Sequence, residues 1–132
     1  MKPGAVLLYK DFRFDDGTIK DKLMVVVGDD VATDKTMVVL TTSQQHQKLF
    51  KDGCQSTPFE TYYVFNAHLG GFKKTTWVIL KPRLLATSKL ANRVASGSVA
   101  VLHSLVQVDY SALKNCFKRS EDVSPYQIGL LK

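Results

Sequence analysis

The chain has 132 residues, enough for one domain over residues 1–132 that buries a core without disulfides or a structural metal. Hydrophobic residues make up 45% and charged residues 23%, which excludes a disordered, low-complexity or collagen-like chain. The net charge of +6 would attract a polyanion or an acidic protein, and a solvated basic surface without a ligand accounts for it equally well.

The first half of the chain contains apolar segments that favour β-strands. Residues 5–9 are an apolar run that continues over residues 10–14 with alternating polar and aromatic residues. Residues 23–27 and 36–41 are rich in β-branched residues, as in strands buried on both faces. Asp15-Asp16-Gly17 predicts a turn, because Asp caps turns and Gly adopts positive φ freely. Residues 44–51 predict one or two helical turns that end at Asp52-Gly53.

The second half combines further strands with short helices. Strands are predicted over residues 60–65, 75–80 and 99–105. Ser88 is expected to cap a helix over residues 88–94, Asp109 to cap a second helix, and Ser124-Pro125 to begin a last helical turn. Leu113, Cys116 and Phe117 would share one face of the second helix. Five or six strands with small helices indicate a mainly β (α+β) fold, a compact antiparallel barrel or curled sheet.

The two cysteines, Cys54 and Cys116, match neither CxxC chemistry nor a zinc site. We therefore expect reduced thiols in a reducing compartment, with a single bridge as the open alternative. No segment approaches the roughly 20 apolar residues of a membrane span, so a cytoplasmic protein without membrane contact is expected. No metal or cofactor motif is present in the sequence.

Three features in the first 45 residues, in order and spacing, resemble the PemK/MazF family of toxin endoribonucleases. A Gly precedes an apolar strand, a loop ending in a basic residue enters a strand of valines, and an apolar run ends in a hydroxyl pair. The matching segments are Lys2-Pro3-Gly4-Ala5-Val6-Leu7-Leu8, Asp16-Gly17-Thr18-Ile19-Lys20-Asp21-Lys22-Leu23-Met24-Val25-Val26-Val27 and Val38-Val39-Leu40-Thr41-Thr42-Ser43. Beyond them the resemblance is an order of strands with a closing helix.

The resemblance implies an SH3-like antiparallel β-barrel with short helices, including a C-terminal helix. It also implies a type II toxin that cleaves single-stranded RNA without a metal or cofactor, forms a homodimer and is blocked by a cognate antitoxin. The sequence departs from the family at Lys22-Leu23, where better-known members have Arg-Pro, and Lys lacks the bidentate fork that suits a phosphate. An acidic and basic pair found in some members has no clear match near residues 81–83.

RNA cleaves when its 2′-hydroxyl attacks the adjacent phosphate, so the enzyme has to move protons and stabilise the charged transition state. The resemblance makes Lys22, Thr42 and Ser43 the candidate catalytic residues. Without it, Lys22 is an exposed base flanking a strand, and the two hydroxyls cap the helical stretch that follows. The general base is left open among residues of suitable type: His46, His68, His103, Asp15, Asp16 and Glu60.

Single-stranded RNA is bound by aromatic rings interleaved with cations. Of the chain's many aromatic residues we select Phe72, which adjoins Lys73 and Lys74 in a glycine-rich loop, as the base-stacking platform. Lys20 and His46 are the other predicted RNA contacts.

Two further functions compete with the ribonuclease. One is a non-catalytic barrel that binds RNA or a protein target such as gyrase, as the CcdB group does, and the substitution of Lys for Arg favours it. The other is an interaction module that shares only the fold, since one fold hosts many functions.

Overall fold

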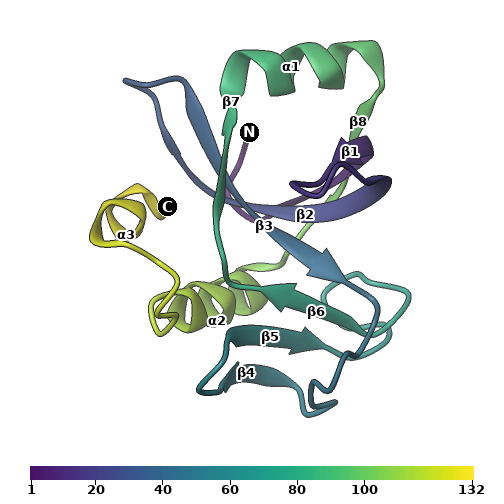
Figure 1. The fold of residues 1–132 in the computed structure, drawn as a ribbon, viewed down its shortest axis with the longest axis vertical. Helices are drawn as coiled ribbons and strands as arrows, with labels where there is room; N and C mark the ends of the chain where they lie inside the picture. Colours follow the sequence, from purple (N-terminus) through teal and green to yellow (C-terminus); the bar gives the residue numbers. More distant parts are fainter.

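A computed structural model describes residues 1–132, which form eight strands and three short helices (Figure 1). The strands are β1 (Ala5–Arg13), β2 (Ile19–Asp30), β3 (Lys35–Thr42), β4 (Gly53–Ser56), β5 (Thr61–Phe65), β6 (Thr76–Ile79), β7 (Arg83–Ala86) and β8 (Val99–Ser104). The helices are α1 (Thr87–Ser96), α2 (Gln107–Phe117) and α3 (Pro125–Leu130). The prediction of a mainly β chain with short helices is confirmed.

The strands form one antiparallel sheet that bends at β3. The strand order is β4-β5-β6-β3-β2-β1-β8, and β7 pairs with the first part of β3. The last residues of β3, Thr41 and Thr42, pair instead with β6, so β3 belongs to both halves of the sheet. The end strands β4 and β8 do not pair with each other, and the sheet is therefore not closed. A barrel is not confirmed.

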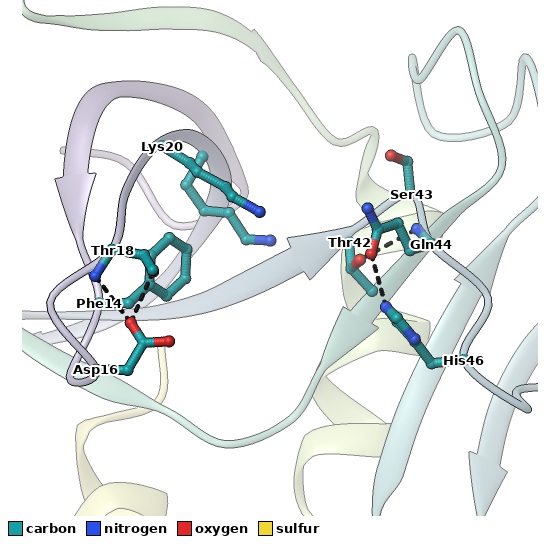
Figure 2. Close-up of a pocket in the computed structure, with 9 residues that line it drawn as sticks. Phe14, Asp16, Thr18, Lys20, Thr42, Ser43, Gln44 and His46 are labelled. Atoms are coloured by element: carbon teal, nitrogen blue, oxygen red, sulfur yellow. Dashed lines mark hydrogen bonds between the residues drawn. The ribbon is translucent and has the colours of Figure 1, made fainter.

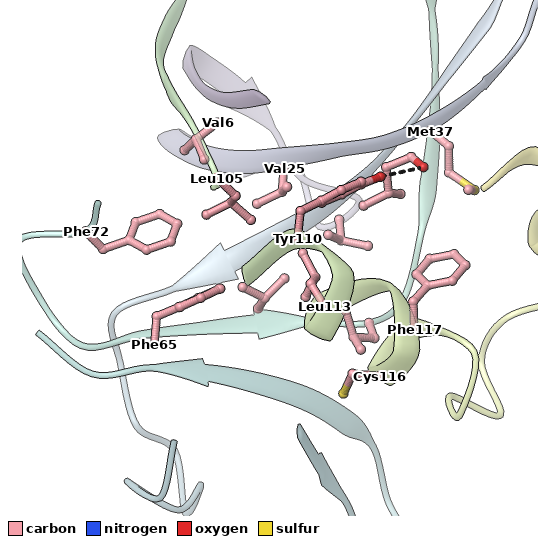
Figure 3. Packing of buried hydrophobic residues seen from close by; sticks show 14 of the residues in the cluster. Val6, Val25, Met37, Phe65, Phe72, Leu105, Tyr110, Leu113, Cys116 and Phe117 are labelled. Atoms are coloured by element: carbon pink, nitrogen blue, oxygen red, sulfur yellow. Dashed lines mark hydrogen bonds between the residues drawn. The ribbon is translucent and has the colours of Figure 1, made fainter. Parts of the chain in front are cut away.

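The largest hydrophobic core lies between the two halves of the sheet and α2 (Figure 3). Leu113, Cys116 and Phe117 are fully buried, as their spacing on one helix face predicts. Above them Tyr110 donates a hydrogen bond from its hydroxyl to the Val27 carbonyl of β2 at 3.2 Å, and this contact fixes α2 against the central strands. A second core lies beneath α1, where Leu90 is buried against β1, β2 and β3.

Helix starts were predicted to within a few residues. The helix predicted from Ser88 begins at Thr87, and no side chain caps it. The helix predicted from Asp109 begins two residues earlier, so Asp109 lies in its first turn, where a carboxylate favours the helix dipole. Ser124 forms the predicted cap of α3: its hydroxyl accepts a hydrogen bond from the Gln127 backbone amide, and the Gln127 side-chain oxygen accepts one from the Ser124 backbone amide.

The helical turns predicted over residues 44–51 do not form. Side chains from β5 and β6 form hydrogen bonds with backbone groups of this segment instead. Trp77 donates from Nε1 to the Leu49 carbonyl at 2.8 Å, and the Tyr62 hydroxyl accepts from the Leu49 amide at 3.0 Å. Because these tertiary contacts satisfy the peptide groups of Leu49, the segment is a loop with a turn at His46 and Gln47 and not a helix.

Cys54 and Cys116 form a disulfide, which contradicts the expectation of reduced thiols and realises the alternative of a single bridge. Their sulfurs lie 2.09 Å apart and connect β4 to α2 across 62 residues of sequence. The spacing gave no sign of the bridge because the packing of α2 on the β4–β5 hairpin creates it. Disulfides are typical of oxidising compartments, so the cysteines no longer support a cytoplasmic location. None of the three helices has the length and apolarity needed to cross a membrane.

Candidate functional site

An open cavity of about 330 Å³ lies between the β1–β2 turn and the end of β3 (Figure 2). Five of the eight predicted site residues line it, namely Lys20, Lys22, Thr42, Ser43 and His46. The other lining residues are Phe14, Asp16, Thr18 and Gln44. All but Phe14 are polar, and the cavity contains two lysines, several hydroxyl groups, an imidazole and a carboxylate.

The register of two strands brings the predicted catalytic residues together. β2 and β3 are antiparallel neighbours with Met24 opposite Leu40, so Lys22 and Thr42, two residues beyond each, arrive at the same end of the pair. The neighbouring Thr41 hydroxyl donates to the Leu23 carbonyl at 3.0 Å and ties the two strand ends together. Residues 20 positions apart in the sequence therefore line one cavity.

Lys22 is half-buried beside the ring of Phe14, with its Nζ 5.6 Å from the ring centroid. Burial lowers the pKa of Lys22 below its ordinary value, and the positive charge of Lys20 lowers it further. Neither lysine takes part in any of the three ion pairs of the structure. The two ammonium groups are therefore available to an anionic ligand.

The carboxylate of the cavity, Asp16, is held by the β1–β2 turn. Its Oδ1 accepts hydrogen bonds from the Thr18 hydroxyl at 2.7 Å and the Thr18 amide at 2.9 Å (Figure 2). These bonds lower the pKa of Asp16, which keeps it ionised and makes it a weak proton acceptor. Gly17 has the positive φ that the turn motif predicts.

On the opposite wall, a short hydrogen-bonded chain orients His46. The Thr42 hydroxyl accepts a hydrogen bond from the Gln44 backbone amide at 3.1 Å, and the Gln44 side-chain oxygen lies 2.7 Å from His46 Nε2. Because an amide oxygen only accepts, Nε2 is the donor in this contact. In the neutral imidazole that leaves Nδ1 as a proton acceptor. His46 is exposed, as expected for this residue.

The predicted stacking role of Phe72 is wrong. Its side chain is only 4% exposed and packs on Phe65 and His103, with centroid distances of 5.5 and 5.4 Å. The preceding turn causes this: a Cβ on Gly70 would lie 2.7 Å from the Phe65 ring, so the chain turns tightly there and directs Phe72 into the core.

Lys73 and Lys74 are exposed and line a different cavity, of about 520 Å³. It shares one wall residue, Ser43, with the first cavity. The predicted RNA contacts thus divide between two neighbouring depressions, and the loop lysines are not in the group that surrounds Lys22.

Two of the six candidate general bases, His46 and Asp16, line the cavity. The remaining four have other surroundings. Asp15 pairs with Arg83 at 3.3 Å and Glu60 with Lys48 at 3.4 Å. His103 is half-buried, with Nε2 2.9 Å from the Gly70 carbonyl oxygen, and His68 lies on the surface loop after β5.

Sequence reasoning did not assign Thr18, Gln44 or Phe14 to the site. Thr18 had a signal, since Asp-Gly-Thr is the pattern of an Asp side chain that accepts from the residue two positions on. Phe14 is one of the aromatic residues from which Phe72 is selected, and Gln44 has no signal. The positions of both depend on how the β1–β2 hairpin and the loop after β3 fold.

No family model, curated protein or solved structure matches the chain. The geometry of the cavity and the resemblance of the first 45 residues are therefore the observations that bear on function. No group of three or more His, Cys, Asp or Glu side chains is arranged to hold a metal ion.

Proposed function

We propose that the chain is a metal-independent endoribonuclease that cleaves single-stranded RNA and acts as the toxin of a type II toxin-antitoxin pair. The observation that carries the proposal is the convergence of Lys22 with Thr42 and Ser43 on one cavity, in which Lys20 and His46 also lie. The SH3-like barrel, the cognate antitoxin and the homodimer belong to the same proposal and are supported by the resemblance to the PemK/MazF family.

The two lysines and the hydroxyls would bind the scissile phosphate. Lys20 and Lys22 have no carboxylate partner within ion-pair distance, so a phosphate supplies the missing charge. The Thr42 and Ser43 hydroxyls donate to its non-bridging oxygens, and negative charge that develops there in the transition state is stabilised by donors fixed on a strand end. Phe14 is the half-buried aromatic residue of this cavity and offers a ring face to a base.

Residues on the two walls of the cavity provide a route for the proton. His46 Nδ1 accepts the proton of the 2′-hydroxyl as this oxygen bonds to phosphorus. The bond from phosphorus to the 5′-oxygen breaks, and the Lys22 ammonium gives that oxygen a proton. The lowered pKa of Lys22 suits this role, because it makes the ammonium a better acid than an ordinary lysine. The products are a 2′,3′-cyclic phosphate and a free 5′-hydroxyl.

A non-catalytic relative that binds RNA, or a protein target as the CcdB group does, is the second candidate. The observation that favours it is the state of Asp16, whose hydrogen bonds from Thr18 lower its pKa and leave it a weak base. If His46 does not accept the proton either, the cavity binds an anion and performs no chemistry.

The deciding experiment incubates purified protein with a mixed pool of single-stranded RNA in EDTA and examines the fragment ends. We expect 2′,3′-cyclic phosphate ends from the wild type and very little cleavage by Lys22→Ala. Lys89→Ala is the matched control, because Lys89 is an exposed lysine of α1 that does not line the cavity. Equal cleavage by all three proteins would indicate a contaminating nuclease.

Growth on induced expression separates the toxin from an RNA-binding module. We expect arrest by the wild type and by Lys89→Ala, and normal growth with Lys22→Ala. Absence of cleavage together with persistent arrest in Lys22→Ala would move the assignment to a protein target.

A further inference from the structure

A second cavity, of about 220 Å³, adjoins the candidate site. The two cavities share Phe14, Lys22 and Thr42 as wall residues. The second adds two further cations, Lys81 and Arg83, which the proposed reaction does not use. Four positively charged side chains therefore line two cavities that share one half-buried aromatic ring, Phe14.

Arg83 is held in place by an aromatic ring beside the cavity that it shares with Lys22. Its guanidinium carbon lies 5.6 Å from the ring centroid of Phe12, and that ring meets Phe14 edge to face at 5.2 Å. Lys22 stacks on Phe14 at 5.6 Å, so the order is Arg83, Phe12, Phe14 and Lys22. The backbone of Arg83 is fixed by its pairing with Val38 of β3. The guanidinium is thus positioned before any ligand binds.

The present partner of Arg83 is easily displaced. Asp15 Oδ2 lies 3.3 Å from Arg83 Nη2, but the Asp15 side chain is 92% exposed and belongs to the β1–β2 turn. An ion pair with so exposed a partner is screened by water and salt and contributes little. A phosphate offers two oxygens to the planar guanidinium and is the stronger partner.

We propose that Arg83, with Lys81, binds the phosphate adjacent to the scissile one, on the other side of a base stacked on Phe14. The inference rests on the proposed function and extends it: the substrate is a single strand with at least two consecutive phosphates in contact with the protein. Its path runs from the Lys22 cavity toward β7, and Asp15 occupies the second phosphate position when RNA is not bound.

The test measures binding of a fluorescent, non-cleavable 2′-deoxy oligonucleotide by anisotropy over a range of salt concentrations. We expect Arg83→Ala to weaken binding about ten-fold, the loss typical of a charge-assisted contact. It should also reduce the slope of log affinity against log salt by about 0.7, the value of one phosphate contact on a single strand.

Arg93→Ala is the matched control, because it removes the same charge and the same type of stacking contact elsewhere. Arg93 lies over Tyr9 at 5.0 Å and lines neither cavity. We expect no change in its affinity or salt slope. Asp15→Ala should act in the opposite direction and tighten binding, because it removes the competing carboxylate. The thermal unfolding midpoint of each variant is compared with that of the wild type.

The outcomes distinguish a failure of the second phosphate site from a failure of the proposed ribonuclease reaction. If the wild type cleaves RNA and Arg83→Ala binds like Arg93→Ala, the second phosphate site is wrong and the ribonuclease stands. If the wild type binds the oligonucleotide without cleaving RNA, and Arg83→Ala still lowers the affinity and slope, the site is right and the chemistry is wrong. If the wild type neither binds nor cleaves, both proposals are overturned.

Discussion

Two basic regions of the molecule differ in how their cations are placed. Lys20 and Lys22 lie on a regular strand, β2, and Lys22 is half-buried against the ring of Phe14. Lys73 and Lys74 lie exposed on the loop between β5 and β6, and the adjacent Phe72 faces the core. In the first region a half-buried ring lies against a lysine, whereas in the second the ring of Phe72, although it lines the same cavity as Lys73 and Lys74, is only 4% exposed.

The contrast shows that an aromatic residue next to lysines in sequence can line a cavity with them and still be buried too deeply to stack on a base. The glycine turn before Phe72 sends that ring inward while the lysines that follow remain in solvent. Phe14 and Lys22 are eight residues apart, and the β1–β2 hairpin folds them onto each other. The predictions below test whether this difference in placement is also a difference in role.

Phe72→Ala should have the largest effect, and on stability. Loss of a fully buried Phe that packs on Phe65 and His103 leaves a cavity, so we expect a decrease of about 4 kcal/mol in the free energy of unfolding. Denaturant titration measures it. Phe14→Ala is the comparison, because its ring is half-buried: its main effect should be weaker oligonucleotide binding. A Phe72→Ala protein of normal stability that binds RNA poorly would restore Phe72 as a stacking platform.

Removal of the disulfide should also affect stability and not chemistry. The bridge joins β4 to α2 and lies outside the Lys22 cavity, so its loss mainly releases conformational entropy in the unfolded chain. We expect Cys54→Ser to lower the free energy of unfolding by about 3 kcal/mol, and a reductant to lower the wild type similarly. Cleavage per folded molecule should be unchanged. Wild-type stability that does not respond to a reductant would show that the thiols are not bridged.

Lys22→Ala should reduce cleavage by roughly 100- to 1,000-fold, the effect of removing one donor to a developing oxyanion. Lys73→Ala removes the same charge from the loop and should change the rate only a few-fold, because an exposed lysine contributes mainly to long-range attraction. Single-turnover rates on one RNA provide the measurement. Equal losses in the two variants would mean that net charge, and not placement in the cavity, determines activity.

Much of the sheet and some of the site could be predicted from the sequence. The composition of the apolar runs in β2 and β3 strongly favours buried strands. Ser124-Pro125 fixes the start of α3 by local chemistry alone. The family pattern selects Lys22, Thr42 and Ser43, which the antiparallel register then brings together. These features depend on short segments whose structure is set locally or by one neighbouring strand.

What could not be predicted depends on distant contacts. Each of the four-residue strands β4 and β7 pairs with a neighbour, β5 or β3, and has no strong pattern of its own. Residues 44–51 have a helix-like composition, but Trp77 and Tyr62 form hydrogen bonds with the backbone of Leu49 in this segment. The disulfide and the burial of Phe72 likewise arise from the packing of elements far apart in the chain. Propensity in the segment itself contains no information on these contacts.

The smallest effect expected is a shift in the pH dependence of cleavage. As the proton donor, Lys22 must be protonated, so the rate falls when the pH exceeds its pKa. Burial and the charge of Lys20 lower that pKa. The alkaline limb of the pH–rate profile, over which the rate falls, should therefore lie below the ordinary lysine value of 10.5.

Lys20→Ala removes the second of these causes but not the burial. The limb should move to higher pH and still remain below the ordinary value, because burial is the larger cause. Rates measured from neutral to alkaline pH, with the Lys22→Ala rate subtracted to remove hydroxide-catalysed hydrolysis, give the position of the limb. A limb that stays in place in Lys20→Ala would show that another group donates the proton. Lys22 would then act only as a phosphate-binding charge, as Lys20 does.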